Sequence, residues 1–408
     1  MNGEAAPSRP AVAPVPRPVK GLAAVSFFND LASEMVYPLL PAFVTTVLGG
    51  GAATLGALDG ASDLTASVLR WFSGRLADRR GWRRPLILAG YLTAILVRPV
   101  ISMASTAWQV VGFRIIDRLG KGLRSPARDA LISELTPAEA RGRAYGFHRA
   151  ADHAGAVLGS LVAWALLQGQ VDVRQVIEWS VLPGLVAFVV LAWVLRTAHS
   201  APTPGLARPG PVPAPFRDST GTAFWTPAAA IAALTVLRLP EALLLLRLQD
   251  SGVAVALIPL AWAGLHVVRS AAAYPGGALA DRIGARTALL SGSVLYAGLA
   301  AGLASQGHAA VTTLLFLALG GVSGLFEPAE RALIAALAPV RTGRGFGAAQ
   351  AVTGLAALPA GLAFGALYQW AGAPVALLVS AGSVVLAAGV WGVGRHRHAG
   401  TAGQAGRE

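Results

Sequence analysis

The sequence predicts an all-α polytopic membrane protein, with twelve transmembrane helices in two pseudo-symmetric six-helix bundles. Three observations carry this prediction. Hydrophobic residues make up 54% of the 408-residue chain and charged residues only 13%, against roughly 25% charged in a soluble domain. Apolar runs of about twenty residues, the length that crosses a bilayer, recur along the chain. Two motifs of the first half also return in the second half.

The apolar runs define the predicted spans in chain order. Proline, glycine and charged residues separate the runs, and each run is long enough to cross the hydrocarbon. The chain also contains 48 glycines, which suits helices that approach closely in lipid. The spans are expected at 21–48, 54–74, 85–104, 107–132, 144–168, 176–196, 223–248, 253–276, 286–305, 309–337, 345–369 and 373–394.

The loops between these spans alternate in charge. Those after odd-numbered spans are short and nearly uncharged, whereas those after even-numbered spans carry arginine. Because basic loops concentrate on the cytoplasmic side, both termini and every even loop are expected in the cytoplasm. The net charge of +13 would suggest nucleic-acid binding in a soluble protein; here it follows the predicted membrane topology.

Composition also divides the chain into domains. Residues 1–20 form a Pro- and Ala-rich tail without the apolar core of a cleaved signal. Residues 199–222 are rich in Pro and Gly and are expected to form a flexible cytoplasmic linker. This linker separates an N-terminal six-helix half, 21–198, from a C-terminal half, 223–394. Residues 395–408 are a second cytoplasmic tail.

Two pairs of matching segments indicate that the halves are duplicates. Residues 74–83 read GRLADRRGWR and residues 277–286 read GALADRIGAR, each between two apolar runs. Residues 126–132 (PARDALI) match residues 328–334 (PAERALI) in the same way. Two matches in the same register are hard to obtain by chance, so an internal repeat is predicted.

The first of these motifs carries a family resemblance. The pattern Gly-x-Leu-Ala-Asp-Arg-x-Gly-x-Arg between spans two and three resembles the signature loop of the major facilitator superfamily, and the copy around Asp281 lies where that family has a second, degenerate one. The segment from Arg118 to Gly122 resembles the family's Arg-x-x-x-Gly motif, with Lys121 where glutamine is common.

The resemblance extends from Lys20 to Arg395 and fits a drug-exporter-like or an uncharacterised bacterial branch. It implies a secondary transporter that works by alternating access, with a central substrate cavity between two six-helix halves. It also implies that spans one, four, seven and ten line this cavity.

The residue types of the signature loop suit a gate that opens and closes between two states. Gly74 and Gly81 permit close packing and a left-handed turn, and Asp78 can accept hydrogen bonds from a helix end or pair with arginine. Contacts that break in one of two states would let the halves rock; the alternative is a topology anchor and tight turn. The predicted gating residues are Gly74, Asp78, Arg79, Gly81, Arg83, Asp281 and Arg282.

Charged residues inside the membrane are costly and usually face a cavity or one another. Asp30 and Glu34 are four residues apart in span one and share a helix face. Because burial raises a carboxyl pKa and a nearby cation lowers it, we predict that both acids carry protons, with Arg118 as their switchable partner. The alternative is a permanent buried salt-bridge network. Asp59 and Asp63 are expected nearer the outer mouth, in contact with water.

Further side chains are predicted to line the cavity. The basic residues of span four suggest an anion-attracting wall, although Arg124 and Arg128 are expected to reach the lipid headgroups instead. The predicted cavity and substrate residues are Tyr37, Phe28, Asp117, Lys121, Arg114, Arg238, Glu241 and Glu327.

Other residue types argue against further sites. Tryptophans near span ends, Trp262 among them, are expected in the interfacial belt. The histidines show no metal-ligand spacing, with His148 and His153 on different faces of span five, and the chain has no cysteine. We therefore predict no metal and no cofactor, with the proton as coupling ion.

These observations predict a secondary active transporter, not an enzyme, that moves a small organic solute. We expect a proton-coupled antiporter that works in efflux, acts as a monomer in the bacterial inner membrane and binds no nucleic acid. The alternative is a transporter of an anionic metabolite or metal chelate that uses the basic span four. A non-transporting receptor or an intramembrane enzyme is a remote alternative, because no nucleophile is expected beside a base.

Overall fold

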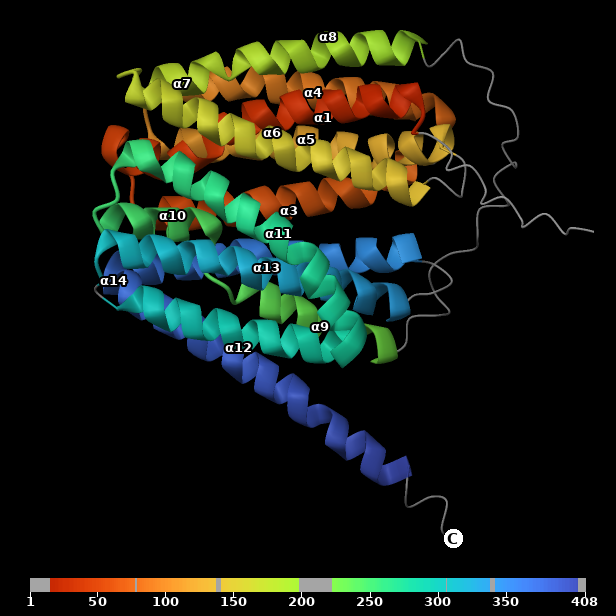
Figure 1. Cartoon of the computed structure of the whole chain (residues 1–408), viewed down its shortest axis with the longest axis vertical. Helices are drawn as coiled ribbons and strands as arrows, with labels where there is room; N and C mark the ends of the chain where they lie inside the picture. The colour runs from red at the N-terminus through yellow and green to blue at the C-terminus, as the bar shows by residue number, and fades with distance from the viewer. Residues whose placement is uncertain are drawn as a thin grey trace, which may run out of the picture.

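The computed structural model describes residues 15–77, 79–136, 141–197, 222–305, 307–337 and 342–402. Every regular element in these ranges is helical. Figure 1 shows long helices side by side, with the N-terminal half in red to yellow and the C-terminal half in green to blue. The linker 199–222, apart from its last residue, and residues 1–14 and 403–408 of the two tails lie outside the described residues.

The described part of the N-terminal half contains eight α-helices. A capping box of Thr106 and Gln109 starts α5, and the Asp172 side chain caps α7. The helix α7 continues into α8 as one crossing. The elements are α1 (Arg17–Val36), α2 (Leu40–Ala42), α3 (Ala52–Ala77), α4 (Arg80–Ser102), α5 (Ala107–Leu135), α6 (Arg141–Gln168), α7 (Val173–Trp179) and α8 (Val181–Thr197).

The C-terminal half contains six more helices. Gly284, with φ of 86°, separates α11 from α12, and Gly372, with φ of 84°, divides α14 into two crossings. Glycine adopts this left-handed region without a Cβ clash. The elements are α9 (Thr222–Val236), α10 (Glu241–Asp250), α11 (Ile258–Ile283), α12 (Ala285–Ala304), α13 (Ala309–Leu337) and α14 (Thr342–Ala402).

The helices cross the membrane twelve times. Eight stretches of the described residues are long and apolar enough to do so by length and composition. One of them, 348–393, includes both crossings of α14. The helices α1, α3 and α5 add three more crossings, each with four or more charged residues. The predicted fold class is confirmed.

Equivalent contacts in the two halves reflect the internal repeat. A Cβ atom placed on Gly74 would lie 4.0 Å from Cβ of Pro126, and one placed on Gly277 would lie 3.6 Å from Cβ of Pro328. Each glycine precedes a copy of the signature loop, and each proline begins the second repeated motif. The two repeated motifs therefore pack on each other within each half.

The halves meet along helices with small residues. α3 packs along α14, where a Cβ on Gly56 would lie 2.0 Å from the carbonyl oxygen of Gly361. Only glycine permits such an approach of two backbones. α6 packs against α11 in the second contact between the halves.

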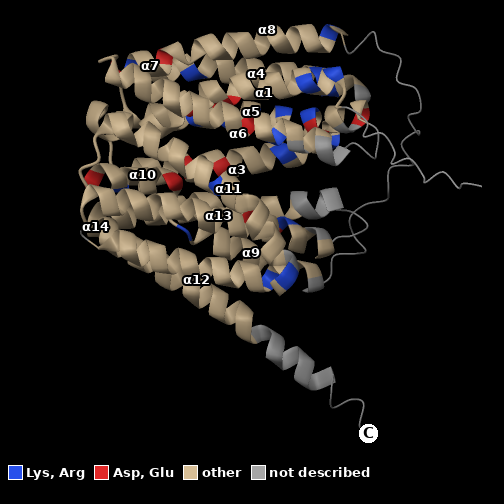
Figure 2. Ribbon diagram, viewed as in Figure 1, with Lys and Arg blue, Asp and Glu red and all other residues tan. Residues whose placement is uncertain are grey.

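Charge distinguishes the two ends of the bundle. Figure 2 shows lysine and arginine gathered at the right-hand end, where α1 begins and α5 ends. We call this end the basic face. The opposite end, where α4 ends and α10 ends, is called the far face.

Candidate functional site

A cavity of about 540 Å³ lies between the two halves. Its walls come from α1, α3 and α5 on one side and from α9, α10, α11, α12, α13 and α14 on the other. Among the described residues, six carboxylates and four basic side chains line it, together with His266. These charged residues are Glu34, Asp59, Asp63, Glu241, Glu327, Glu330, Arg118, Lys121, Arg238 and Arg269.

The seventh crossing is broken beside this cavity. Helix α9 ends at Val236 and α10 begins at Glu241, with non-helical backbone between them. The Tyr296 hydroxyl accepts from the Leu239 N–H at 2.7 Å, and the Ser380 hydroxyl donates to the Leu237 carbonyl at 2.7 Å. Irregular backbone at membrane depth requires such partners and marks the binding region in many transporters.

Asp59 joins the two halves at the far end of the cavity. Its Oδ1 accepts from the Tyr37 hydroxyl at 3.1 Å, and its Oδ2 accepts from the Ala242 N–H at 2.8 Å. Tyr37 follows α1, whereas Ala242 lies in the first turn of α10 in the other half. The Gln249 amide also donates to Thr45 Oγ1 at 3.4 Å across the same gap. These contacts hold the far face closed.

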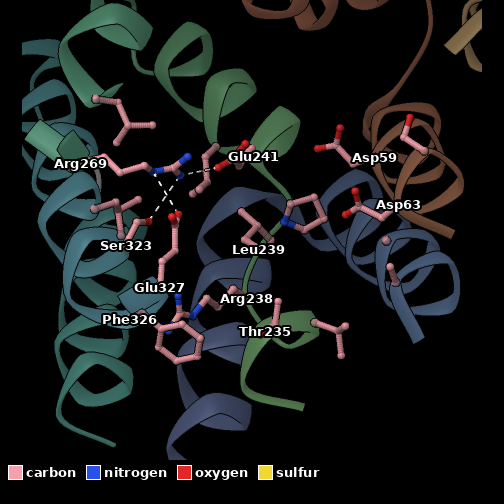
Figure 3. Close-up of a pocket in the computed structure, with 18 of the residues that line it drawn as sticks. Asp59, Asp63, Thr235, Arg238, Leu239, Glu241, Arg269, Ser323, Phe326 and Glu327 are labelled. Atoms are coloured by element: carbon pink, nitrogen blue, oxygen red, sulfur yellow. Dashed lines mark hydrogen bonds and ion pairs between the residues drawn. The ribbon is translucent and has the colours of Figure 1, made fainter. Parts of the chain in front are cut away.

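A second charged network lies within the C-terminal half. Arg269 of α11 forms an ion pair with Glu241 at 2.8 Å and a longer one with Glu327 at 3.7 Å, and it donates to Ser323 at 3.4 Å (Figure 3). The network ties α10 and α13 to α11. Glu241 and Glu327 thus share one guanidinium, so loss of either carboxylate charge would change the pairing of the other.

Trp262 lies at the cavity rather than in the interfacial belt, so the prediction for it was wrong. Its side chain is 2% exposed, and its indole N–H donates to Glu34 Oε2 at 2.8 Å. Its ring lies 5.2 Å from that of Tyr37. The reason is that the start of α11 faces α1 across the interface between the halves, where no lipid reaches it.

Three basic side chains of the lining lack an acidic partner within ion-pair distance in the described part of the chain. Arg238 stacks on Phe326, with the guanidinium carbon 3.7 Å from the ring centre, and its buried Nε and Nη2 make no hydrogen bond there. Arg118 Nε is likewise buried without a hydrogen-bond partner in the described residues. Lys121 lies on the same wall as Arg118, one helical turn away.

The structure brings together most of the predicted cavity residues but not all. Arg114 and Asp117, both predicted to line the cavity, lie outside the lining. Asp117 pairs with Arg114 at 3.2 Å and with Arg98 of α4 at 3.3 Å, and none of the three is more than 2% exposed. Their face of α5 packs on α4 because Arg98, a charge that the sequence analysis did not weigh, supplies the partner.

Phe28 and Asp30 also lie outside the lining. Phe28 packs edge-on against Phe27, and Asp30 accepts a hydrogen bond from the Asn29 amide at 3.0 Å. The predicted residues that do line the cavity are Glu34, Tyr37, Arg118, Lys121, Arg238, Glu241 and Glu327.

The signature loop is described in part. Asp78 and the side chain of Asp281 lie outside the described residues. Arg83 forms an ion pair with Glu134 of α5 and donates to the Ala77 carbonyl at 2.7 Å. This contact ties the loop to the end of the fourth crossing, where a gate would act.

The glycines of the loop behave differently in the two copies. Gly81 lies inside α4 with helical backbone, so the left-handed turn expected there is wrong. Its counterpart Gly284 has the positive φ instead. Arg79 precedes α4, and Arg282 lies in the last turn of α11, both exposed.

The sequence analysis did not place Asp59, Asp63, Trp262 and His266 at the site. The internal repeat is the sequence feature that identifies these residues as equivalent pairs. The offset that relates Gly74 to Gly277 also relates Asp59 to Trp262 and Asp63 to His266. All four line the cavity, so the same face of the repeated helix lines it in both halves.

Twelve crossings in two related halves around a charged cavity define a multi-pass membrane transporter. The chain belongs to the Major Facilitator Superfamily, whose sequence profile matches residues 22–268. It is 29% identical over 351 residues to an uncharacterised MFS-type transporter of Methanocaldococcus jannaschii, which covers 84% of this chain and 86% of that one.

Two further likenesses are more limited. The multidrug resistance protein MdtH of Photorhabdus laumondii subsp. laumondii is 34% identical over 134 residues, 33% of each chain. A bacterial homologue of the human lysosomal transporter Spinster, solved inward-facing and occupied, superposes with a TM-score of 0.71 at 16% identity. The match covers 93% of this chain and 96% of that one, and at this identity it shows the fold alone.

Proposed function

We propose that the protein exports a small organic solute in exchange for protons, by alternating access. Asp59 is the observation that carries this proposal. Its carboxylate accepts hydrogen bonds both from the Tyr37 hydroxyl and from the Ala242 N–H of the opposite half. A hydrogen bond to a charged group contributes about 1.5–3 kcal/mol, enough to bias a conformational equilibrium.

The mechanism follows from competition for this carboxylate. A proton on Asp59 removes its charge, and a cationic group of a solute competes with Tyr37 and Ala242 for the same oxygens. Either event weakens the contact that closes the far face. Because a proton and a cationic solute would exclude each other at Asp59, each would displace the other, which is the requirement for exchange in opposite directions.

Charge and likeness support the orientation and direction. The basic face carries the lysines and arginines of the helix ends (Figure 2), and the positive-inside bias places such a face in the cytoplasm. In that orientation both termini are cytoplasmic, and the far face opens to the outside of an inner membrane. The partial likeness to a multidrug resistance protein supports export.

The test uses proteoliposomes that contain the purified chain, with ethidium as the probe and an imposed pH gradient. We expect Asp59→Asn to reduce gradient-driven ethidium transport at least tenfold while membrane insertion stays normal. Asp172→Asn is the matched control, because Asp172 is exposed in a loop and only caps α7. Unchanged gradient-driven transport by the Asp59 variant would contradict the proposal.

A second candidate function is transport of an organic anion. Arg118, Lys121 and Arg238 supply positive charge to the cavity without an acidic partner within ion-pair distance among the described residues. Such groups attract and orient a carboxylate or phosphate.

Radiolabelled benzoate distinguishes the two candidates in the same proteoliposomes. If the solute is an anion, wild-type protein takes up benzoate and Lys121→Ala lowers this uptake at least tenfold. Transport of ethidium without benzoate would exclude the anion candidate.

A further inference from the structure

A second polar cluster lies in the N-terminal half, outside the cavity lining. Ser26 of α1 lies 3.0 Å from Nε2 of His148 in α6, and Nδ1 of His148 lies 3.5 Å from Oδ2 of Asp152. Arg128 of α5 donates to the Ser26 hydroxyl oxygen at 2.9 Å. These four side chains connect three crossings in one chain of contacts.

The donors and acceptors of the cluster determine where its protons lie. Arginine can only donate, so the Ser26 oxygen accepts from Arg128 and its own proton is directed to Nε2 of His148. A neutral His148 then carries its proton on Nδ1, which faces Asp152. This tautomer is set by the partners on the two sides of the ring.

The cluster is buried, and its acceptor atoms can accommodate one more proton on His148. Ser26, His148 and Asp152 are 1%, 2% and 7% exposed, and Oδ1 of Asp152 makes no hydrogen bond in the described part of the chain. The Ser26 oxygen has a second lone pair, so it can accept from a protonated Nε2 as well as from Arg128. Both charge states of His148 therefore find partners.

Charged groups surround the cluster on all three crossings. On α6, Arg149 lies 3.6 Å from Asp152 and has a side chain that is 56% exposed, whereas on α5 Arg128 pairs with the half-exposed Asp129. On α1, Asp30 follows Ser26 by four residues and shares its helix face. The cluster thus has exposed charges beside it on α6 and α5, and a carboxylate one helical turn away on α1.

We propose that His148 is a proton-binding site of the exchange cycle. The inference rests on the proposed proton coupling and names a site for it outside the cavity. His148 takes up one proton at Nε2 and then donates to Ser26 from Nε2 and to Asp152 from Nδ1. Release of a proton from Nε2 restores the neutral imidazole, so one proton is bound and one is released in each cycle.

A hydrolytic role does not fit the same geometry. The contacts run from Ser26 to His148 and from His148 to Asp152, as in the serine–histidine–aspartate triad of a hydrolase. The expectation that no nucleophile lies beside a base was therefore wrong. However, the Ser26 hydroxyl is 1% exposed and already accepts from Arg128. It therefore lacks the access that a nucleophile requires for an incoming carbonyl.

The first test measures the tautomer directly. We expect ¹⁵N-histidine NMR of the purified full chain to show His148, assigned through His148→Gln, protonated on Nδ1 and accepting on Nε2 at high pH. Both nitrogens gain protons on acidification, and Ser26→Ala shifts the Nε2 signal. A proton on Nε2 at high pH, or no change between about pH 5 and 9, would overturn the inference.

The second test compares two histidines of one helix in ethidium-loaded proteoliposomes. We expect His148→Gln to lose at least tenfold of gradient-driven transport and to keep ethidium counterflow, which needs no net proton movement. His153→Gln, at an exposed position of α6, keeps both. Retention of driven transport by His148→Gln would overturn the coupling role of His148, whereas a wild type without driven transport would contradict the proposed function and leave the NMR result to decide the proton site.

Discussion

Asp117 and Asp59 show how the partner decides what a membrane carboxylate can do. Asp117 pairs with Arg98 and Arg114 in one half, where neighbouring helices keep their contacts. Asp59 accepts from Tyr37 and from Ala242 in the opposite half. Only the second contact spans an interface that the proposed alternating access must break, so the proposal assigns the switching role to Asp59 and a stabilising role to Asp117.

This difference predicts the effect of Asp117→Asn. The change leaves Arg98 and Arg114 buried without their counter-charge, which costs about 3–5 kcal/mol for a broken buried pair. We expect a clear fall in the thermal unfolding temperature of the detergent-solubilised protein. The affinity of the folded fraction for its solute should match wild type, because Asp117 lies outside the cavity. Weakened solute binding with unchanged stability would assign Asp117 to the site instead.

At the scale of elements, the important features of the helices are a break within one crossing and a close contact between two others. The break between α9 and α10 turns the Ala242 N–H toward Asp59. The glycine contact of α3 with α14 brings two backbones together along the interface between the halves. Both features depend on residues that are poor helix formers in isolation.

The glycine contact can be tested with a single methyl group. Alanine at Gly56 places Cβ 2.0 Å from the Gly361 carbonyl, so the two helices must separate at a cost of about 1–3 kcal/mol. Gly389→Ala is the control, since a Cβ there meets nothing within 4 Å and alanine favours the helix by up to about 1 kcal/mol. We expect Gly56→Ala to lower the unfolding temperature and Gly389→Ala to keep or raise it. Equal effects would show that the contact contributes nothing.

At the scale of the whole molecule, the two halves meet firmly at the far face. Tyr37, Asp59 and Ala242 close the end of the cavity there, and Gln249 donates to Thr45 beside them. The structure is therefore closed on the side away from the basic face. In the proposed alternating access, this contact opens and re-forms in every cycle.

The absence of cysteine from the chain makes this closure easy to test. We expect a Thr45→Cys, Gln249→Cys pair, joined by oxidation or by a short bis-maleimide, to stop ethidium transport almost completely. Reduction of the disulfide restores the rate, and either single cysteine leaves it near wild type. Full transport by the cross-linked protein would show that the far face does not move.

The sequence determined the number of crossings, their division into two related halves and the separation of basic from uncharged loops. These properties follow from local patterns: apolar runs set by bilayer thickness, and charges set by the side of the membrane. The resemblance of 74–83 to one superfamily was equally local. Seven of the predicted site residues line the cavity: five of the predicted cavity residues, and two of the predicted proton-coupling residues, Glu34 and Arg118.

Only the tertiary structure decided which way each charged face turns. Asp117 lies outside the cavity because its partner Arg98 is on the adjacent helix. Trp262 lines the cavity because the start of α11 faces α1. Ser26 and His148 met across more than a hundred residues of sequence. Helical periodicity shows which residues share a face, but the partner of that face depends on how twelve helices pack together, and a one-dimensional pattern does not contain that information.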